Sequence, residues 1–197
     1  DPDDAADIIG DLPYEKAEKL LKLMGVEEEA SVRGLLGYKE ETAGGIMTPD
    51  FVAVEDDLTV QDAVDAIRSL DEDQESVHYL YLVSEGRVLT GVVSLRELVI
   101  SKPDSPLAEI ATKDLITAPP ELDQEECAQM ISKYDLLALP VVDEQGVILG
   151  VVTVDDAMDV MEEEHEEDLQ QQSITSPWVI GIIVFLIAVI CALVIML

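Results

Sequence analysis

The chain has 197 residues, enough for one ordinary core or two small ones, and its 43 acidic residues against 11 basic ones give a formal net charge of −32. Such an excess of negative charge repels phosphate backbones, so the sequence argues against nucleic-acid binding. It also destabilises a compact state unless cations screen it, and divalent metal is the simplest candidate. A merely solubilising acidic surface is the alternative that composition leaves open.

The first residues of the chain and its two cysteines indicate where the protein is located. The first eleven residues, DPDDAADIIGD, are acidic and do not form a signal peptide, and we expect the chain to be part of a longer one. Cys127 falls in an apparently globular region and Cys191 in an apolar tail, so no disulfide framework is expected and the soluble part is interpreted as cytosolic.

Residues 1–40 are expected to form short helices. LPYEKAEKLLKLMG has an apolar stripe at helical spacing, with Gly25 as its C-terminal cap. VEEEASVRGLLGYKEE continues as a second helix with Val32, Leu35 and Leu36 inward. Two or three short helices bury little apolar surface by themselves, and we therefore expect them to pack on another part of the chain.

An internal repeat occupies the middle of the sequence. MTPDFVAVEDDLTVQDAVDAIRS from Met47 aligns with ATKDLITAPPELDQEECAQMISK from Ala111, and LVSEGRVLTGVVSLREL from Leu82 aligns with VVDEQGVILGVVTVDDA from Val141. Each copy predicts a strand (FVAV or LITA), a helix, two strands joined by SEGR or DEQG turns, and a last helix.

The last helix of each copy opens on a hydroxyl residue with an acid three positions later. Ser94 precedes Glu97 in the first copy, and Thr153 precedes Asp156 in the second. This spacing predicts a capping box in the first copy and its Asp variant in the second.

This β-α-β-β-α unit resembles the CBS module, and two such units pack into a Bateman module; the resemblance covers residues 47–161. It implies an α+β fold. The expected domains are the end of a helical N-terminal domain at 1–40, a first CBS repeat at 41–108, a second repeat with its acidic helix at 109–168, a linker at 169–177 and a transmembrane helix at 178–197. In CBS modules the [ST]-x-x-D pattern holds a nucleotide's ribose and phosphate, which makes Ser94, Thr153 and Asp156 candidates for adenine-nucleotide (ATP) binding.

The helix that begins at Val154 is unusually acidic, because nine of the fourteen residues from 155 to 168 are carboxylates. Like charges three or four positions apart destabilise a helix, and a divalent cation reverses that effect. Mg²⁺ suits such acids because it takes oxygen ligands and keeps several waters. The helical period places one set of side chains toward a core: Val154, Ala157, Met158, Met161 and Leu169. It places another set within an arc of about 100° on the opposite side: Asp156, Asp159, Glu163, Glu166 and Glu167.

The stretch WVIGIIVFLIAVICALVIML at 178–197 has no charged residue and would span about 30 Å as a helix, the thickness of a bilayer core. It predicts a transmembrane helix, with residues 1–172 cytoplasmic at the cell membrane. It is either a tail anchor or the first span of a larger membrane domain, and flanking basic residues give no orientation, because the last one before it is Lys133.

Several stretches together resemble the cytosolic part of the MgtE family of bacterial magnesium channels: YKEETAGGIMT at 38–48, YLYLVSEGRVLTGVVSLREL, DQEECAQMISKYDLLALPVVDEQG and GVVTVDDAMDVMEEEHEEDL. The family implies a homodimer, joined through its CBS domains, whose N-terminal domain and CBS pair close around several Mg²⁺ ions. On the matching positions its metal-facing residues are Asp3, Asp7, Gly45 (by its carbonyl), Glu125, Asp135, Asp156, Asp159, Glu164, Glu167 and Asp168. Residues 173–197 do not resemble the family's connecting or pore helices, so conduction is not credited to this chain alone.

Other chemistries find little support in the sequence. DEDQESVHYLYL from Asp71 lacks the central Gly and final Glu of an EF-hand loop, and the two histidines have no metal-ligand spacing. No nucleophile motif or phosphate loop is present, so no catalytic residue and no enzyme activity are expected. A Mg²⁺-sensing module is the leading hypothesis, and a membrane-anchored nucleotide-binding CBS pair and a dimerisation scaffold are the alternatives.

Overall fold

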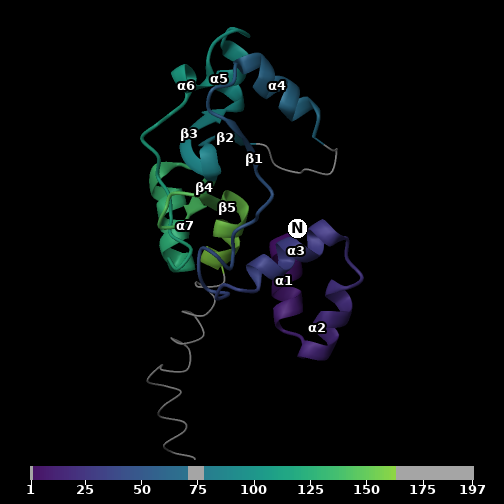
Figure 1. Cartoon of the computed structure of the whole chain (residues 1–197). Helices are drawn as coiled ribbons and strands as arrows, with labels where there is room; N and C mark the ends of the chain where they lie inside the picture. The colour runs from purple at the N-terminus through teal and green to yellow at the C-terminus, as the bar shows by residue number, and fades with distance from the viewer. Residues whose placement is uncertain (1, 71–77, 163–197) are drawn as a thin grey trace, which may run out of the picture. The chain divides into compact units, whose positions relative to one another are not determined.

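The computed structural model describes residues 2–70 and 78–162 (Figure 1). The chain divides into two compact units, Asp1–Ala157 and Met158–Leu197. Across the described residues, no helix combines the length and the apolar character needed to cross a membrane. The segment predicted to span a bilayer, 178–197, lies outside the described residues.

Three short helices open the described chain: α1 (Pro2–Gly10), α2 (Tyr14–Leu21) and α3 (Val26–Leu35). α1 contacts both of the others, and Val32 and Leu35 are buried as expected, whereas Leu36 is 38% exposed. Gly25, the expected C-cap of α2, has extended backbone angles of −62° and 159° and begins α3 instead. The observed C-cap of α2 is Lys22, three residues earlier than expected.

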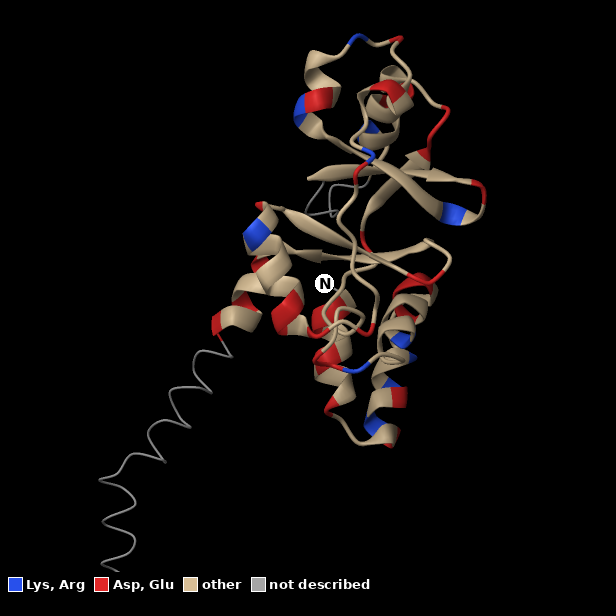
Figure 2. Ribbon diagram, turned by 90° about the vertical axis from the view of Figure 1, so that its left-hand side faces the viewer, with Lys and Arg blue, Asp and Glu red and all other residues tan. Residues whose placement is uncertain are grey.

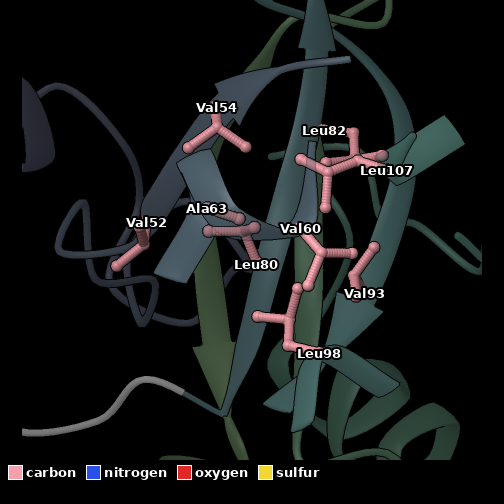
Figure 3. Packing of buried hydrophobic residues seen from close by; sticks show 9 residues of the cluster. All are labelled: Val52, Val54, Val60, Ala63, Leu80, Leu82, Val93, Leu98 and Leu107. Atoms are coloured by element: carbon pink, nitrogen blue, oxygen red, sulfur yellow. The ribbon is translucent and has the colours of Figure 1, made fainter. Parts of the chain in front are cut away.

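The first repeat forms a three-stranded sheet. Its elements are β1 (Val52–Glu55), α4 (Val60–Arg68), β2 (Tyr79–Ser84), the 3-10 turn η1 (Glu85–Arg87), β3 (Val88–Ser94) and α5 (Leu95–Ile100), and α6 (Leu107–Ile110) follows. The strand order is β1-β2-β3, with β1 parallel and β3 antiparallel to β2. Aliphatic side chains from the sheet and the three helices make one core (Figure 3): Val52, Val54, Val60, Ala63, Leu80, Leu82, Val93, Leu98 and Leu107.

The second repeat consists of α7 (Gln124–Tyr134), β4 (Ala138–Val142), β5 (Ile148–Thr153) and helical residues 154–162, with β4 and β5 antiparallel. The strand expected at LITA is reduced to one parallel bridge between Ala118 and Val141. Pro119 and Pro120 follow at once, and because proline has no N–H they cannot extend the ladder.

The two sheets share a second core. Tyr81 and Val83 of β2 pack with Ala138, Ile148 and Val151 of the second repeat. The two hairpins also join at their turns, where the amide of Leu89 donates to the carbonyl of Gly146 at 2.9 Å. These contacts confirm the predicted α+β fold of two repeated units.

Both predicted caps are present. The Ser94 hydroxyl and amide each donate to Glu97 Oε2 at 2.8 Å, and the Glu97 amide donates back to Ser94 Oγ, which closes a capping box. Thr153 and Asp156 make the corresponding side-chain bond in the second repeat. These caps fix the direction in which each last helix leaves its sheet.

The predicted apolar face of the last helix is wrong in part. Met158 and Met161 are 64% and 50% exposed, whereas Ala157 and Val160 are buried at 2% and 5%. The buried side of the helix thus consists of Ala157 and Val160, which lie about one helical turn apart. Leu169 lies outside the described residues.

Candidate functional site

Asp3 is a buried carboxylate in the first turn of α1, only 7% exposed. Its Oδ1 is buried and, within residues 2–70 and 78–162, has no hydrogen-bond partner. Burial raises the pKa of Asp3 from 3.8 to about 6; a backbone hydrogen bond opposes the shift, and the negative charges of Asp156 and Asp4 add to it. An ionised carboxylate here is costly because its Oδ1 has lost water without gaining a hydrogen-bond donor among the described residues.

Asp156 comes from the far end of the described chain, in the first turn of the helix after β5. It is half-buried and accepts a hydrogen bond from the Thr153 hydroxyl. Burial is the largest cause that raises the pKa of Asp156; the charges of Asp155 and Asp4 add to the shift, and the Thr153 hydrogen bonds oppose it. The fold therefore brings acids of α1 and of the second repeat within range of one another's charge.

Two further predicted ligands lie near the N-terminal helices. Asp7 follows Asp3 by one helical turn on the exposed side of α1. Gly45 is buried in the segment after α3, where a Cβ would lie 2.3 Å from the Lys39 carbonyl oxygen and 2.5 Å from that of Glu40. Only glycine fits so close an approach of two backbone segments.

Glu125 and Asp135 stand at opposite ends of α7. Glu125 is exposed in the first turn and its Oε1 accepts a hydrogen bond from Gln129 at 3.2 Å. Asp135 is the exposed C-cap, with a left-handed φ of 52°. Along α7 the ten positions from Glu125 to Asp135 correspond to about 15 Å at 1.5 Å per residue, so the two residues cannot ligate the same ion.

The predicted metal ligands therefore do not converge on one centre within the described chain. Asp159 is exposed, and Glu164, Glu167 and Asp168 lie outside the described residues. Among the described residues, no three Asp, Glu, His or Cys side chains gather closely enough to hold a metal ion. What the structure does assemble is the charge cluster of Asp3, Asp4 and Asp156. Acidic positions otherwise lie along the helices and loops, while the strands are largely free of them (Figure 2).

Sequence reasoning missed two residues of this region. Asp4 was left out of the ligand set, although its place beside Asp3 in DPDDAAD is visible in the sequence. Tyr79 links the repeats, since its hydroxyl accepts a hydrogen bond from the amide of Leu137 at 3.4 Å. No spacing signal points to that long-range contact.

The family comparison covers almost all of the described chain. Residues 1–41 match the MgtE intracellular N domain, and residues 43–102 and 107–163 each match the CBS domain. The chain belongs to the MgtE family. It carries that family's N domain and its two CBS domains.

Relatives and solved structures agree with this assignment. The magnesium transporter MgtE of Thermus thermophilus is 40% identical over 154 residues, 78% of this chain and 34% of the transporter. A crystal structure of the soluble part of a magnesium transporter has a TM-score of 0.79 at 38% identity, over 83% of this chain and 64% of that one. The cytosolic domain of the Mg²⁺ channel MgtE in complex with ATP has a TM-score of 0.77 at 39% identity, over 81% and 65%.

The chain spans about a third of the length of the curated magnesium transporters it matches. Those transporters are not enzymes, in agreement with the absence of a catalytic motif from the sequence.

The raised pKa of Asp3 predicts how the free energy of unfolding depends on pH. Because its folded pKa of about 6 lies above its unfolded value, stability falls as pH rises from about 4 to about 6 in the presence of a chelator. Asp3→Asn removes that fall, so the variant is more stable than wild type above pH 6, by up to about 3 kcal/mol. Urea unfolding from pH 4 to pH 8 measures the difference.

Asp11→Asn is the matched control, because Asp11 is an exposed acid just beyond α1. It changes net charge equally and should follow the wild-type pH profile. If Asp3→Asn and Asp11→Asn have the same profile, Asp3 is not ionised at a cost in the folded protein.

Proposed function

We propose that this chain is the Mg²⁺-sensing regulatory region of a magnesium channel or transporter. In this proposal, divalent ions bridge acids of the N domain and the CBS pair and thereby control gating. The observation that carries it is the buried Oδ1 of Asp3, which has no hydrogen-bond donor among the described residues. The negative charge of Asp156 also acts on the Asp3 carboxylate. The relatives named for magnesium transport support the choice of ion.

A divalent cation fits these residues chemically. Carboxylate oxygens are the ligands that Mg²⁺ prefers, and it keeps several waters, so it can bridge acids on separate segments without a closed cage. Asp3 and Asp156 would each supply a ligand to the ion, and Asp4 would add negative charge nearby. When bound, the ion supplies positive charge that turns the repulsion among them into shared attraction. Without it, the same repulsion favours separation of α1 from the second repeat.

The remaining acids extend the proposal along the chain. Asp7, Glu125, Asp135 and Asp159 are exposed. The separation of Glu125 from Asp135 requires more than one ion or ligands from another subunit.

The acidic helix leads toward the apolar segment 178–197, which we propose spans the cell membrane with residues 1–172 on the cytoplasmic side. Ion-dependent ordering of that helix would then reach the membrane.

A homodimer formed through the CBS domains is part of the proposal. On α5, Leu95, Val99 and Ile100 are 40%, 83% and 66% exposed. A contiguous patch of exposed aliphatic side chains is a feature of protein–protein interaction sites. A second copy of the chain would cover them.

The Mg²⁺ dependence of stability tests the proposed function. At about 10 mM Mg²⁺, each ion that binds the folded state with a dissociation constant near 1 mM adds about 1.4 kcal/mol. We therefore expect the melting temperature of the chain in mild detergent to rise over its value in chelator at matched ionic strength. Protease resistance should rise in parallel.

Screening of a net charge of −32 also stabilises the chain, so matched variants are needed. Asp3→Asn and Asp156→Asn should lose much of the Mg²⁺-specific increment, whereas Asp11→Asn should keep it. An equal melting temperature in chelator and in Mg²⁺ for wild type rules the proposal out.

Adenine-nucleotide binding is the alternative function, and one observation favours it. Thr153 and Asp156 form the hydroxyl and carboxylate pair expected of a CBS nucleotide site, and the MgtE cytosolic domain that this chain resembles was solved with ATP. Ser94 makes the equivalent pair with Glu97, which is longer by one methylene. Asp156 is claimed by both functions, so nucleotide and metal would influence each other.

Calorimetry with ATP and AMP tests the alternative. Thr153→Ala should weaken binding because the ribose and phosphate lose a hydroxyl partner, whereas Thr153→Ser keeps both hydroxyl and cap and should bind like wild type. The serine variant controls for loss of the threonine methyl, and the lost cap of the alanine variant alone costs about 1 kcal/mol of stability. Equal affinity of the alanine variant and wild type would count against a role for Thr153.

A further inference from the structure

The segment at residues 41–48, here called the entry strap, joins the N domain to the CBS pair. It precedes the first repeat in sequence, yet its backbone is bonded to the second. The bonds are Gln124 N to Glu41 O at 3.1 Å, Ala43 N to Leu122 O at 2.7 Å, Gly44 N to Pro120 O at 2.9 Å, Thr48 N to Val151 O at 2.8 Å and Val151 N to Thr48 O at 2.9 Å. The N domain is therefore fastened to the second repeat before the chain enters β1.

Side chains of the entry strap reinforce this attachment. Ala43 is fully buried and Met47 is 3% exposed. A Cβ at Gly150 of β5 would lie 2.9 Å from the Met47 side chain, so the strap packs directly on the strand that leads to Thr153. Five backbone hydrogen bonds and two buried side chains thus hold the entry strap on the second repeat.

Gly44 is a point of close contact between a side chain that follows α3 and the entry strap. A Cβ there would lie 2.6 Å from Cγ and Cδ1 of the Tyr38 ring and 3.1 Å from the Pro120 carbonyl oxygen. Tyr38 directly follows the C-terminal turn of α3, to which its amide is bonded through Leu35 O at 2.9 Å. The ring on one side and Pro120 on the other leave room for glycine alone.

These contacts connect the two acids of the candidate site. Asp3 belongs to α1, which packs on α3, and α3 leads to Tyr38 and Gly44. At its other end, the entry strap is hydrogen-bonded to Val151 of β5. Val151 lies two residues before Thr153, whose hydroxyl donates a hydrogen bond to Asp156. The separation of the two carboxylates is thus set through the strap.

We propose that the contact of the Tyr38 ring with Gly44 is a positioning device that holds the N domain on the second repeat so that Asp3 meets Asp156. This inference rests on the proposed function, because its consequence is the Mg²⁺ concentration at which the region responds. Tyr38 and Gly44 are positioning residues and do not contact the ion.

Gly44→Ala tests the device in the full chain in mild detergent. The added methyl displaces Tyr38, so the arrangement that brings the acids together becomes less populated. If that population falls to about a tenth, the Mg²⁺ concentration at half response rises about tenfold. Hydrogen exchange of the Ala43 and Gly44 amides should also become faster, which locates the loosening in the entry strap.

Two variants separate positioning from general damage. Gly34→Ala is the matched glycine control, because a Cβ at Gly34 meets no atom within 4 Å, and its Mg²⁺ response should equal that of wild type. Tyr38→Ala removes the ring that the methyl of Gly44→Ala would strike. In the Tyr38→Ala background Gly44→Ala should therefore shift the Mg²⁺ midpoint much less than it does in wild type.

The outcomes are distinct. A wild-type chain without any Mg²⁺ response overturns the proposed function. A responsive wild type whose midpoint is unchanged by Gly44→Ala overturns the positioning device alone. If Tyr38→Ala and Gly44→Ala shift the Mg²⁺ midpoint additively, the contact between Tyr38 and Gly44 is not the cause of the shift.

Discussion

Repulsion between carboxylates that the fold itself buries is the constraint on which the candidate site depends. A solvated aspartate on a helix costs little, but Asp3 has lost most of its water, and its Oδ1 has no donor within the described residues. Its pKa of about 6 means that the carboxylate is ionised at neutral pH in spite of that cost. A group held in this condition responds strongly to any cation that reaches it, because the charge is poorly screened.

The CBS pair supplies the geometry that keeps the acids together. The two repeats share a core between their sheets, and matching caps at Ser94 and Thr153 direct the last helix of each. The entry strap then ties the N domain to the second repeat, the same repeat that carries Asp156. Local capping, sheet packing and one tight glycine contact thus bring residues 3 and 156 within range of each other's charge.

Much of this was predictable from the sequence, where the responsible interactions are local. The order of elements in each repeat and the two caps follow from periodicity and from spacings of three residues. The charge interaction of Asp3 with Asp156 does not, because the two residues are about 150 positions apart in sequence. The LITA strand was overestimated for a different reason, since its β propensity is outweighed by the missing N–H groups of Pro119 and Pro120. The exposed Met158 and Met161 show that an apolar stripe alone does not say which residues of a helix face are covered.

A double-mutant cycle on Asp3→Asn and Asp156→Asn, with unfolding free energies measured in chelator and in Mg²⁺, tests the central claim most directly. In chelator the pair should show a repulsive coupling of about 0.5–3 kcal/mol, because either replacement relieves the same repulsion. In Mg²⁺ the sign of the coupling should reverse, since both carboxylates then share the ion. Coupling that is zero in both solutions, or repulsive in both, would contradict the account.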